Sequence, residues 1–264
     1  MAAIATQRRS TARVLRVLMF LATKAEPVPA AALVAECDIP KQTLYPMLRD
    51  MAEAGFVVYF PEERRWGLGV SAFEIGSAYL RSDPLQRLGG PVLDLMARRL
   101  KVTSHLATLH GNEALYIVKH VPDTHAHHLI TEVGVRLPAH LTAVGRAMLS
   151  SLPAHQVRAL YPSDDAFVRR TDHAIASLSQ LRAVLRTDRA RGYSVESDFT
   201  SAGITCIASA IHDRDGRPVA AAGISFETAC HDPESWPDLA IRVQKAAAAV
   251  TARIHGRRHV GSHI

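Results

Sequence analysis

The sequence contains no long hydrophobic run and no closely paired cysteines. No apolar stretch reaches the roughly 20 residues that a helix needs to span a bilayer, so we expect no membrane contact. Residues 1–10 hold no apolar run before a small-residue cleavage site, so we expect no secretory signal. Cys37, Cys206 and Cys230 lack the short paired spacings of a zinc site or disulfide framework and are predicted to be free thiols. These absences predict a soluble, cytoplasmic protein.

Acidic residues are missing from the start of the chain. Four arginines, Arg8, Arg9, Arg13 and Arg16, precede the first acid, Glu26. The whole chain has 31 Lys and Arg against 25 Asp and Glu, a formal net charge of +6. Such an excess favours a polyanion such as DNA through counterion release, but it also fits a solvated basic face. Charge alone therefore leaves both readings open.

The first 70 residues have the pattern of a winged helix. Apolar residues at helical spacing predict helices over Thr11–Ala22, with Ser10 or Thr11 as cap, and over Ala30–Cys37. A third helix is predicted over Lys41–Ala54, ending before Gly55. Two β-rich runs, Phe56–Phe60 and Arg65–Leu68, flank a polar turn and predict a hairpin.

The third helix and the hairpin tip are the candidate DNA-binding elements. One stripe of the helix is apolar and the other polar, and in a winged helix the polar face of this helix can enter the major groove. Basic side chains at the hairpin tip can meet the DNA backbone or minor groove. The predicted DNA-binding residues are Arg8, Arg9, Lys41, Gln42, Thr43, Tyr45, Arg49, Arg64 and Arg65.

Pro46 conflicts with a regular third helix. Proline has no N–H to donate to the carbonyl of Gln42, and in a helix interior it costs about 3 kcal/mol. Either the helix starts late, with Thr43 as its cap and Pro46 in the first turn, or it is kinked. A late start would turn the Pro46 ring outward, toward a thymine methyl.

The remaining residues predict an α+β domain behind a connecting helix. The helix over Ser71–Arg81 has a broad apolar face that can pair with a second subunit, and Asp83-Pro84 marks a boundary. Hairpin-linked strands separated by helical blocks indicate an antiparallel sheet covered by helices. Strands are predicted over 103–110, 114–121, 128–133, 204–211 and 218–226, and helices over 85–100, 142–151, 154–161, 178–191 and 233–254.

Several segments resemble the IclR family of transcriptional regulators. The run from Pro40 to Tyr45 and the Trp66–Gly69 segment resemble its DNA-binding half. Leu137–Leu149, Arg191–Tyr193 and Gly203–Ala208 are similar to its effector-domain segments, and the resemblance runs from about Thr11 to Ile254. It implies a winged helix-turn-helix domain over 8–70, a linker helix over 71–83, a GAF-like effector-binding domain over 84–256 and a disordered tail over 257–264.

The resemblance also implies a partner set and a ligand site. The partners are double-stranded palindromic operator DNA, a small-molecule effector such as a small carboxylate or aromatic acid, and further copies of the chain in a dimer or dimer of dimers. No cofactor and no metal are implied. Free backbone donors at the start of the helix after Thr142 would suit a carboxylate. Carried over by motif, the effector-binding residues are Leu137, Ala143, Val144, Glu196, Ile204, Cys206 and Ser225.

The resemblance has two departures. Pro46 stands where the family usually has a recognition-helix side chain, and Pro29 stands where a helix cap is common. These positions bear on which operator sequence is read, and leave the binding mode unchanged.

An alternative hypothesis is that the chain is an enzyme whose catalytic residues include polar residues of the predicted effector site. Cys206 with a histidine, or Ser225 with His140 and Glu196, has the composition of a covalent acyl-transfer site. However, Cys206 lies in the apolar run Ile204–Ile211, where a cysteine is usually a small buried hydrophobe. We therefore expect no catalytic residues.

Two further readings use other features. His125, His127 and His128 beside Asp123 suggest a metal, but they lack the helical i, i+4 ligand spacing of a metal-binding helix. A winged helix also serves as a protein-interaction module. The alternative function is therefore a small-molecule sensor whose winged helix binds protein instead of DNA, and salt dependence separates the two.

Overall fold

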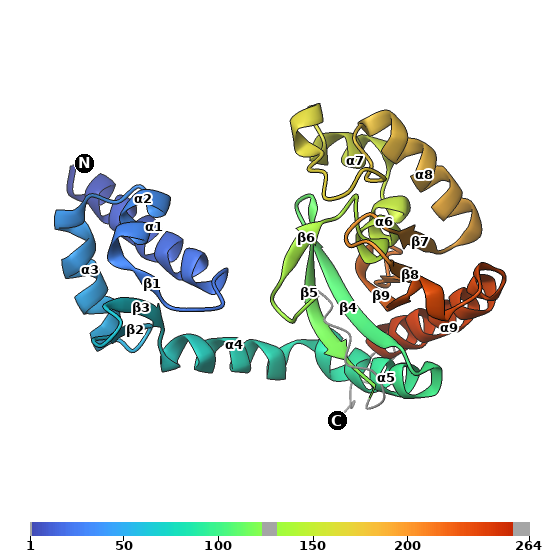
Figure 1. Cartoon of the computed structure of the whole chain (residues 1–264), viewed down its shortest axis with the longest axis horizontal. Coiled ribbons are helices and arrows are strands. Elements are labelled where there is room, and N and C mark those ends of the chain that lie inside the picture. Colours follow the sequence, from blue (N-terminus) through green and yellow to red (C-terminus); the bar gives the residue numbers. More distant parts are fainter. Residues whose placement is uncertain (1, 123–130, 256–264) are drawn as a thin grey trace, which may run out of the picture. The chain divides into compact units, whose positions relative to one another are not determined.

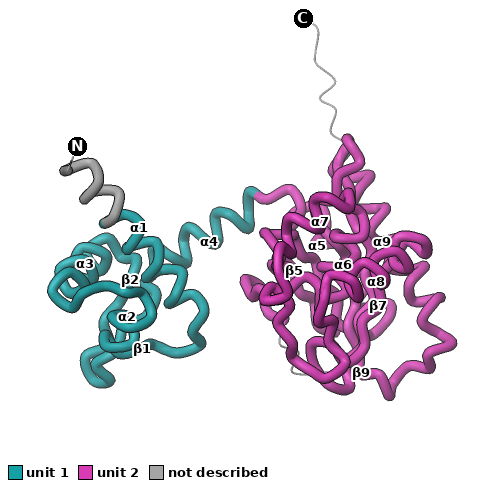
Figure 2. The backbone as a smooth tube through the Cα atoms, turned by 90° about the horizontal axis from the view of Figure 1, so that it is seen from above, with its two compact units in different colours: residues 1–82 teal, residues 83–264 magenta. Residues whose placement is uncertain are grey.

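The chain folds into two compact units. A computed structural model describes residues 2–122 and 131–255, and the side chains of 10–122 and 131–254. Residues 1–82 form one unit and residues 83–264 the other (Figure 2). The side chains of Arg8 and Arg9, and the predicted tail over 257–264, lie outside the described residues. None of the described helices is both long and apolar enough to cross a membrane.

The first unit is a winged helix with a three-stranded antiparallel sheet of order β1-β3-β2. Its first helix begins at Ala2, so the predicted cap at Ser10 or Thr11 is wrong, because the helix continues through both residues. The short strand β1 was not predicted, and it pairs with β3 through Val28 and Pro29. The elements are α1 (Ala2–Ala22), β1 (Val28–Pro29), α2 (Ala30–Cys37), α3 (Lys41–Glu53), β2 (Val57–Phe60), β3 (Arg65–Leu68) and α4 (Val70–Ser82).

The helix α3 packs an apolar stripe into the core of the first unit. Leu44 and Leu48 are fully buried there, against α1 and α2. The amide groups of Thr43 and Leu44 both donate to the carbonyl of Pro40, so the helix is already under way before Pro46. The late start at Thr43 is therefore wrong, and Pro46 lies exposed in the helix interior.

The second unit is built on a six-stranded antiparallel sheet of order β6-β5-β4-β9-β8-β7. The α+β class predicted from the pattern is confirmed. The strands β6 and β7 at the two edges were not predicted, and residues 131–133, the described part of the strand expected over 128–133, are not in a strand. The strands are β4 (Thr103–His110), β5 (Glu113–His120), β6 (Arg136–Pro138), β7 (Ser194–Ser197), β8 (Ile204–His212) and β9 (Pro218–Glu227).

Helices cover both faces of this sheet (Figure 1). On one face, α5 and α9 pack on alternate strand residues such as Leu106, Ile207 and Ile224. On the other, α6 packs on Ala208, and a Cβ added to Gly223 would lie 2.9 Å from a methyl group of Val144. The helices are α5 (Pro84–Leu100), α6 (Ala143–Ser151), α7 (Ala154–Leu160), α8 (Leu178–Arg191) and α9 (Trp236–His255), with 3-10 turns at Asp164–Ala166, Thr228–Cys230 and Pro233–Ser235.

Candidate DNA-binding surface and effector site

The outer face of α3 presents polar and cationic side chains. Lys41, Gln42, Tyr45 and Arg49 are exposed, as a face opposite the buried stripe requires. Lys41 and Arg49 have no hydrogen-bond or ion-pair partner among the described residues, so both cations are free to meet phosphates. Thr43 differs: it is half-buried and lines a groove with Ser10 and Val14 of α1. It therefore lies at the margin of this face.

The two arginines of the wing have different surroundings. Arg64 is exposed in the β2–β3 turn, with a left-handed φ of 54°. Arg65 is half-buried, and its guanidinium donates to the carbonyl of Pro27 over 3.0 Å. That bond ties the wing to the chain entering β1. Arg64 is thus the freer side chain for DNA, while Arg65 holds the hairpin in place.

Predicted effector residues form a row across the second sheet. Glu196 of β7 lies opposite Cys206 of β8, and Cys206 lies opposite Ser225 of β9. Ser225 in turn lies opposite Thr103 of β4. Residues directly opposite each other on neighbouring strands share one face of a sheet, so this row faces α6. Ile204, two residues before Cys206, extends the same face.

Glu196 is occupied by its own loop. One carboxylate oxygen accepts from the hydroxyl of Thr200 over 2.7 Å, and the other accepts from the amide of Phe199 over 3.1 Å. Burial raises the pKa of the Glu196 carboxyl, against these hydrogen bonds, which lower it. The side chain is 1% exposed. It therefore shapes the turn after β7, and these two bonds fix the orientation of its carboxylate.

His105 is a site residue that sequence reasoning missed. Its Nε2 lies 3.0 Å from Oγ of Ser225, which also lies 3.1 Å from Sγ of Cys206. Burial, together with the charge of Lys119, lowers the pKa of His105 to about 3, so the ring is neutral. Strand alternation in the sequence could have indicated it, because His105 lies two residues after Thr103 and therefore on the same face of β4.

The hydrogen-bond geometry fixes how Ser225 can act. Nδ1 of His105 is buried without a hydrogen-bond partner. A buried unpaired N–H is costly, so we expect the ring proton on Nε2, donating to Ser225. The Ser225 hydroxyl hydrogen is then left to donate to Cys206 or to an acceptor atom of a ligand.

The remaining predicted residues form an apolar wall. Leu137, Ala143 and Val144 are buried in one cluster with Tyr116, and Cys206 packs against it. Thr142 caps α6 by accepting from the amide of Gly145 over 3.0 Å. The amide groups in the first turn of a helix have no intrahelical partner, so those of Ala143 and Val144 are not used within α6.

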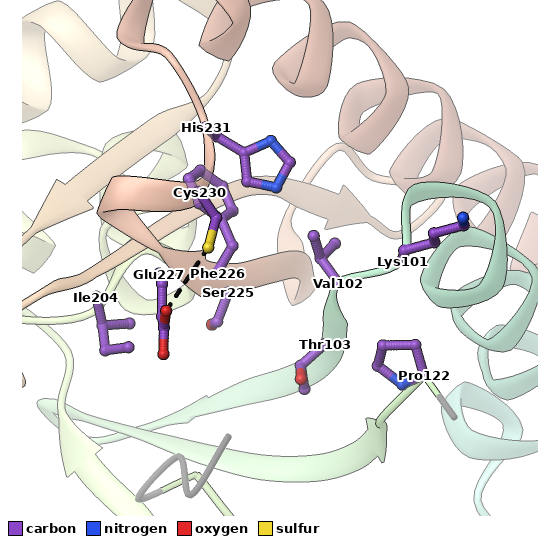
Figure 3. Close-up of a pocket in the computed structure, with 10 residues that line it drawn as sticks. All are labelled: Lys101, Val102, Thr103, Pro122, Ile204, Ser225, Phe226, Glu227, Cys230 and His231. Atoms are coloured by element: carbon purple, nitrogen blue, oxygen red, sulfur yellow. Dashed lines mark hydrogen bonds between the residues drawn. The ribbon is translucent and has the colours of Figure 1, made fainter. Parts of the chain in front are cut away.

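A small cavity opens beside this row (Figure 3). Its lining includes Thr103, Ile204 and Ser225 from the sheet, and Cys230 and His231 from the segment after β9. Its free volume is about 50 Å³. Ligand pockets usually have about 300–1,000 Å³, so this cavity holds water or a very small anion, and a larger ligand needs side chains to move.

The enzyme constellations do not assemble. His140 lies apart from Ser225, since its Nε2 bonds the carbonyl of Val168 over 3.1 Å and its ring contacts Tyr161 and Phe167. Burial raises the pKa of the Cys206 thiol well above its usual value, which disfavours the reactive thiolate.

The described side chains form no cluster suited to a metal ion. No group of three or more His, Cys, Asp or Glu side chains in residues 10–122 and 131–254 is arranged to hold a metal. The residues Asp123, His125, His127 and His128 lie outside the described range.

Family models match both units. The model described as "IclR helix-turn-helix domain" matches residues 10–61, and "Bacterial transcriptional regulator IclR C-terminal" matches residues 77–252. The chain belongs to the IclR family of bacterial transcriptional regulators. The resemblance inferred from the sequence motifs is thereby confirmed.

IclR-family relatives match over nearly the whole chain. The acetate operon repressor of Salmonella typhimurium is 30% identical over 97% of this chain and 94% of its own. The glycerol operon regulatory protein of Streptomyces coelicolor is 30% identical over 92% of this chain and 95% of its own. The IclR regulator from Alicyclobacillus acidocaldarius has a TM-score of 0.83 at 21% identity, covering 93% of this chain and 98% of its own.

IclR-type proteins combine a helix-turn-helix DNA-binding domain with a ligand-binding domain. This chain is accordingly a transcriptional regulator and no enzyme, as the sequence predicted. The two candidate sites described above fall one in each of these domains.

Proposed function

We propose that this regulator binds a palindromic operator as a dimer or dimer of dimers, under the control of a small organic or aromatic acid. The observation that carries the DNA contact is the free cationic face of α3, with Lys41, Gln42, Tyr45 and Arg49 exposed beside the Arg64 wing. Arg8, Arg9 and Thr43 complete the proposed contact, and Arg65 orients the wing.

The linker helix α4 supports pairing of two copies. It buries no residue within its own chain, and Phe73, Ile75 and Tyr79 are 73%, 59% and 55% exposed. Large apolar side chains gathered on one exposed helix usually mark an interaction surface. A second copy of α4 would cover them, and a two-fold dimer would read a two-fold operator.

The hydrogen-bond donors offered to the effector are the first-turn amides of α6 and the hydroxyl of Ser225. A carboxylate would take these donors, and Leu137 and Val144 would contact its apolar part. The chemistry is compatible with an IclR homologue from Microbacterium hydrocarbonoxydans whose structure is described as complexed with 4-hydroxybenzoate. That structure has a TM-score of 0.79 at 21% identity.

Effector binding and operator affinity would be coupled through a change around the cavity beside Ser225. A free volume of about 50 Å³ is too small for an aromatic acid, so we propose that the effector binds after side chains around Ser225 have moved. A ligand that binds one arrangement more tightly shifts the population toward it, and through α4 this would alter operator affinity.

The DNA test is binding of the full chain to DNA upstream of its own gene, titrated with salt. We expect Arg49→Ala and Arg64→Ala each to weaken binding by about 1–3 kcal/mol, and Arg214→Ala, an exposed arginine of the β8–β9 turn, to leave it unchanged. Absence of specific binding to that or adjoining promoter DNA would instead favour a sensor whose winged helix binds protein.

The effector test is thermal unfolding in the presence of acetate, benzoate and 4-hydroxybenzoate. We expect one of these acids to raise the melting temperature of the wild type, and Ser225→Ala to reduce that rise. Ser163→Ala, before the 3-10 turn at Asp164–Ala166, removes an exposed hydroxyl outside both proposed ligand sites and serves as control. An equal rise in the wild type and Ser225→Ala would remove Ser225 from the site.

A further inference from the structure

A groove large enough for a small molecule lies between α7 and α8. It is lined from α7 by Ala154 and Val157, and from α8 by a row of arginines above Leu178 and Leu185. Its free volume is about 440 Å³, within the range of small-molecule sites and well above that of the cavity beside Ser225. Val157 and Leu185 are buried, so the floor is apolar and firmly packed.

Three arginines of α8 share this groove. Arg182, Arg186 and Arg189 occur at i, i+4 and i+7, which places them on one face of the helix over about 10 Å. Like charges three or four residues apart on a helix repel each other and destabilise it. Their concentration on one face is therefore unfavourable for folding, and an anion bound between them would relieve it.

No carboxylate neutralises this row. Arg182 and Arg186 have no hydrogen-bond or ion-pair partner among the described residues, and no acidic residue lines the groove. Arg189 donates to the carbonyls of Ser150 and Leu152, 2.6 Å each, which fixes its guanidinium while leaving its charge uncompensated.

Several other cations of the second unit are paired. Arg98 binds Asp94, Arg191 binds Asp188, and Arg136 lies 3.7 Å from Glu113. The groove between α5 and α9, which is also basic, includes Asp238 in its lining. The α7–α8 groove thus has three arginines and no acid in its lining, whereas the α5–α9 groove has three cations, Arg99, Arg242 and Lys245, and one acid.

We propose that the α7–α8 groove binds a phosphorylated small molecule. A phosphomonoester carries nearly two negative charges and three acceptor oxygens, so more than one guanidinium fork can bind it at once. A monocarboxylate would neutralise only one of the three arginines. The apolar floor formed by Val157 and Leu185 would contact the organic part of the ligand. This site is separate from the proposed operator contact and from the proposed effector site.

The experiment titrates the full chain with inorganic pyrophosphate by calorimetry at fixed ionic strength. We expect binding to the wild type, at least tenfold weaker binding to Arg182→Ala and Arg186→Ala, and an intermediate loss in Arg182→Lys, which keeps the charge but not the fork. Arg214→Ala and Arg49→Ala should bind as the wild type does. All substituted side chains are exposed, and unchanged melting temperatures check that the variants fold.

Four results would overturn the proposal. They are absence of pyrophosphate binding, equal weakening in Arg214→Ala, loss only in Arg49→Ala, and acetate binding as tightly as pyrophosphate at the same ionic strength. A fifth would assign the groove to nucleic acid: Arg182→Ala and Arg186→Ala lowering the affinity for unrelated duplex DNA as much as Arg49→Ala does. None of these results depends on operator binding, so the proposal fails or stands apart from the proposed function.

Discussion

The two units differ in where they keep their polar side chains. The described part of the chain has fourteen buried polar or charged side chains, and all of them lie in residues 83–264. In the first unit, the described side chains of residues 10–82 include no buried polar or charged one. Its core, around Leu33, Leu44 and Leu48, is entirely apolar.

This difference follows from where each unit meets its ligand. DNA is bound at a surface, so a winged helix can keep a simple apolar core and place its cations outside. The proposed effector site lies in the interior of the second unit, and buried donors and acceptors there must be satisfied by each other or by a ligand. Surface substitutions should therefore alter function in the first unit, and substitutions at buried polar groups should alter stability in the second.

The largest expected effect is loss of the buried ion pair between α6 and α8. Arg146 is 1% exposed, its Nε lies 3.8 Å from Asp188, and Asp188 also accepts from Ser194 over 2.7 Å. Arg146→Ala leaves Asp188 with only part of its partners, so we expect the free energy of unfolding of the second unit to fall by about 3–5 kcal/mol. Urea denaturation measures it, and Arg214→Ala, on the surface, should change it by less than about 0.5 kcal/mol. A loss below about 1 kcal/mol in Arg146→Ala would contradict the comparison.

A core substitution should destabilise the first unit alone. Leu48 is fully buried, so Leu48→Ala should lower the free energy of unfolding of residues 1–82 by about 3 kcal/mol. The chain has two tryptophans, Trp66 in the first unit and Trp236 in the second. Trp236→Phe therefore makes fluorescence report on the first unit, and Trp66→Phe on the second. Val58→Ala, at an exposed strand position, is the control, and an equal shift of both units would show that they unfold together.

His105 should give the second unit a dependence on acidic pH that the first lacks. Its folded-state pKa of about 3 lies below the unfolded value of about 6.5. The stability that it contributes is therefore present above pH 6.5 and is lost as pH falls toward 3. Between pH 6.5 and 5 we expect a loss of about 2 kcal/mol in the wild type that is absent from His105→Asn and retained by His173→Asn, at an exposed position. Parallel pH curves for the wild type and His105→Asn would exclude this role.

The smallest expected effect on stability is at the wing. Arg64→Ala should change the free energy of unfolding by less than about 0.5 kcal/mol while reducing the salt dependence of DNA binding by about one ion. Arg65→Ala should instead cost about 1 kcal/mol of stability, because it removes the bond to Pro27. Comparing the two by denaturation and by salt-titrated DNA binding separates a contact residue from a positioning residue. Equal stability losses would show that Arg64 also holds the hairpin.

Local pattern predicted most of the elements. Apolar spacing placed the helices α2 and α8 over Ala30–Cys37 and Leu178–Arg191, and alternation placed the strand β4 over Thr103–His110. Errors occurred where pairing with distant residues decides the state. β1, β6 and β7 are too short to show periodicity, and only their partner strands make them strands.

Pro46 shows a similar limit. Proline penalises a helix interior locally, yet packing of Leu44 and Leu48 keeps α3 continuous from Lys41. The tertiary core offsets a local preference of about 3 kcal/mol, since two fully buried leucines each stabilise by a comparable amount.

By itself the sequence determined the winged helix, the α+β class and the family, because these depend on periodicity and on motifs that are local in the chain. Only the tertiary structure decided that Glu196 is held by its own loop, that Ser225 is partnered by His105 and not His140, and that the arginines of α8 line a groove without acids. Those facts depend on strand register and helix packing, which bring together residues up to 120 positions apart and cannot be read from neighbours in the sequence.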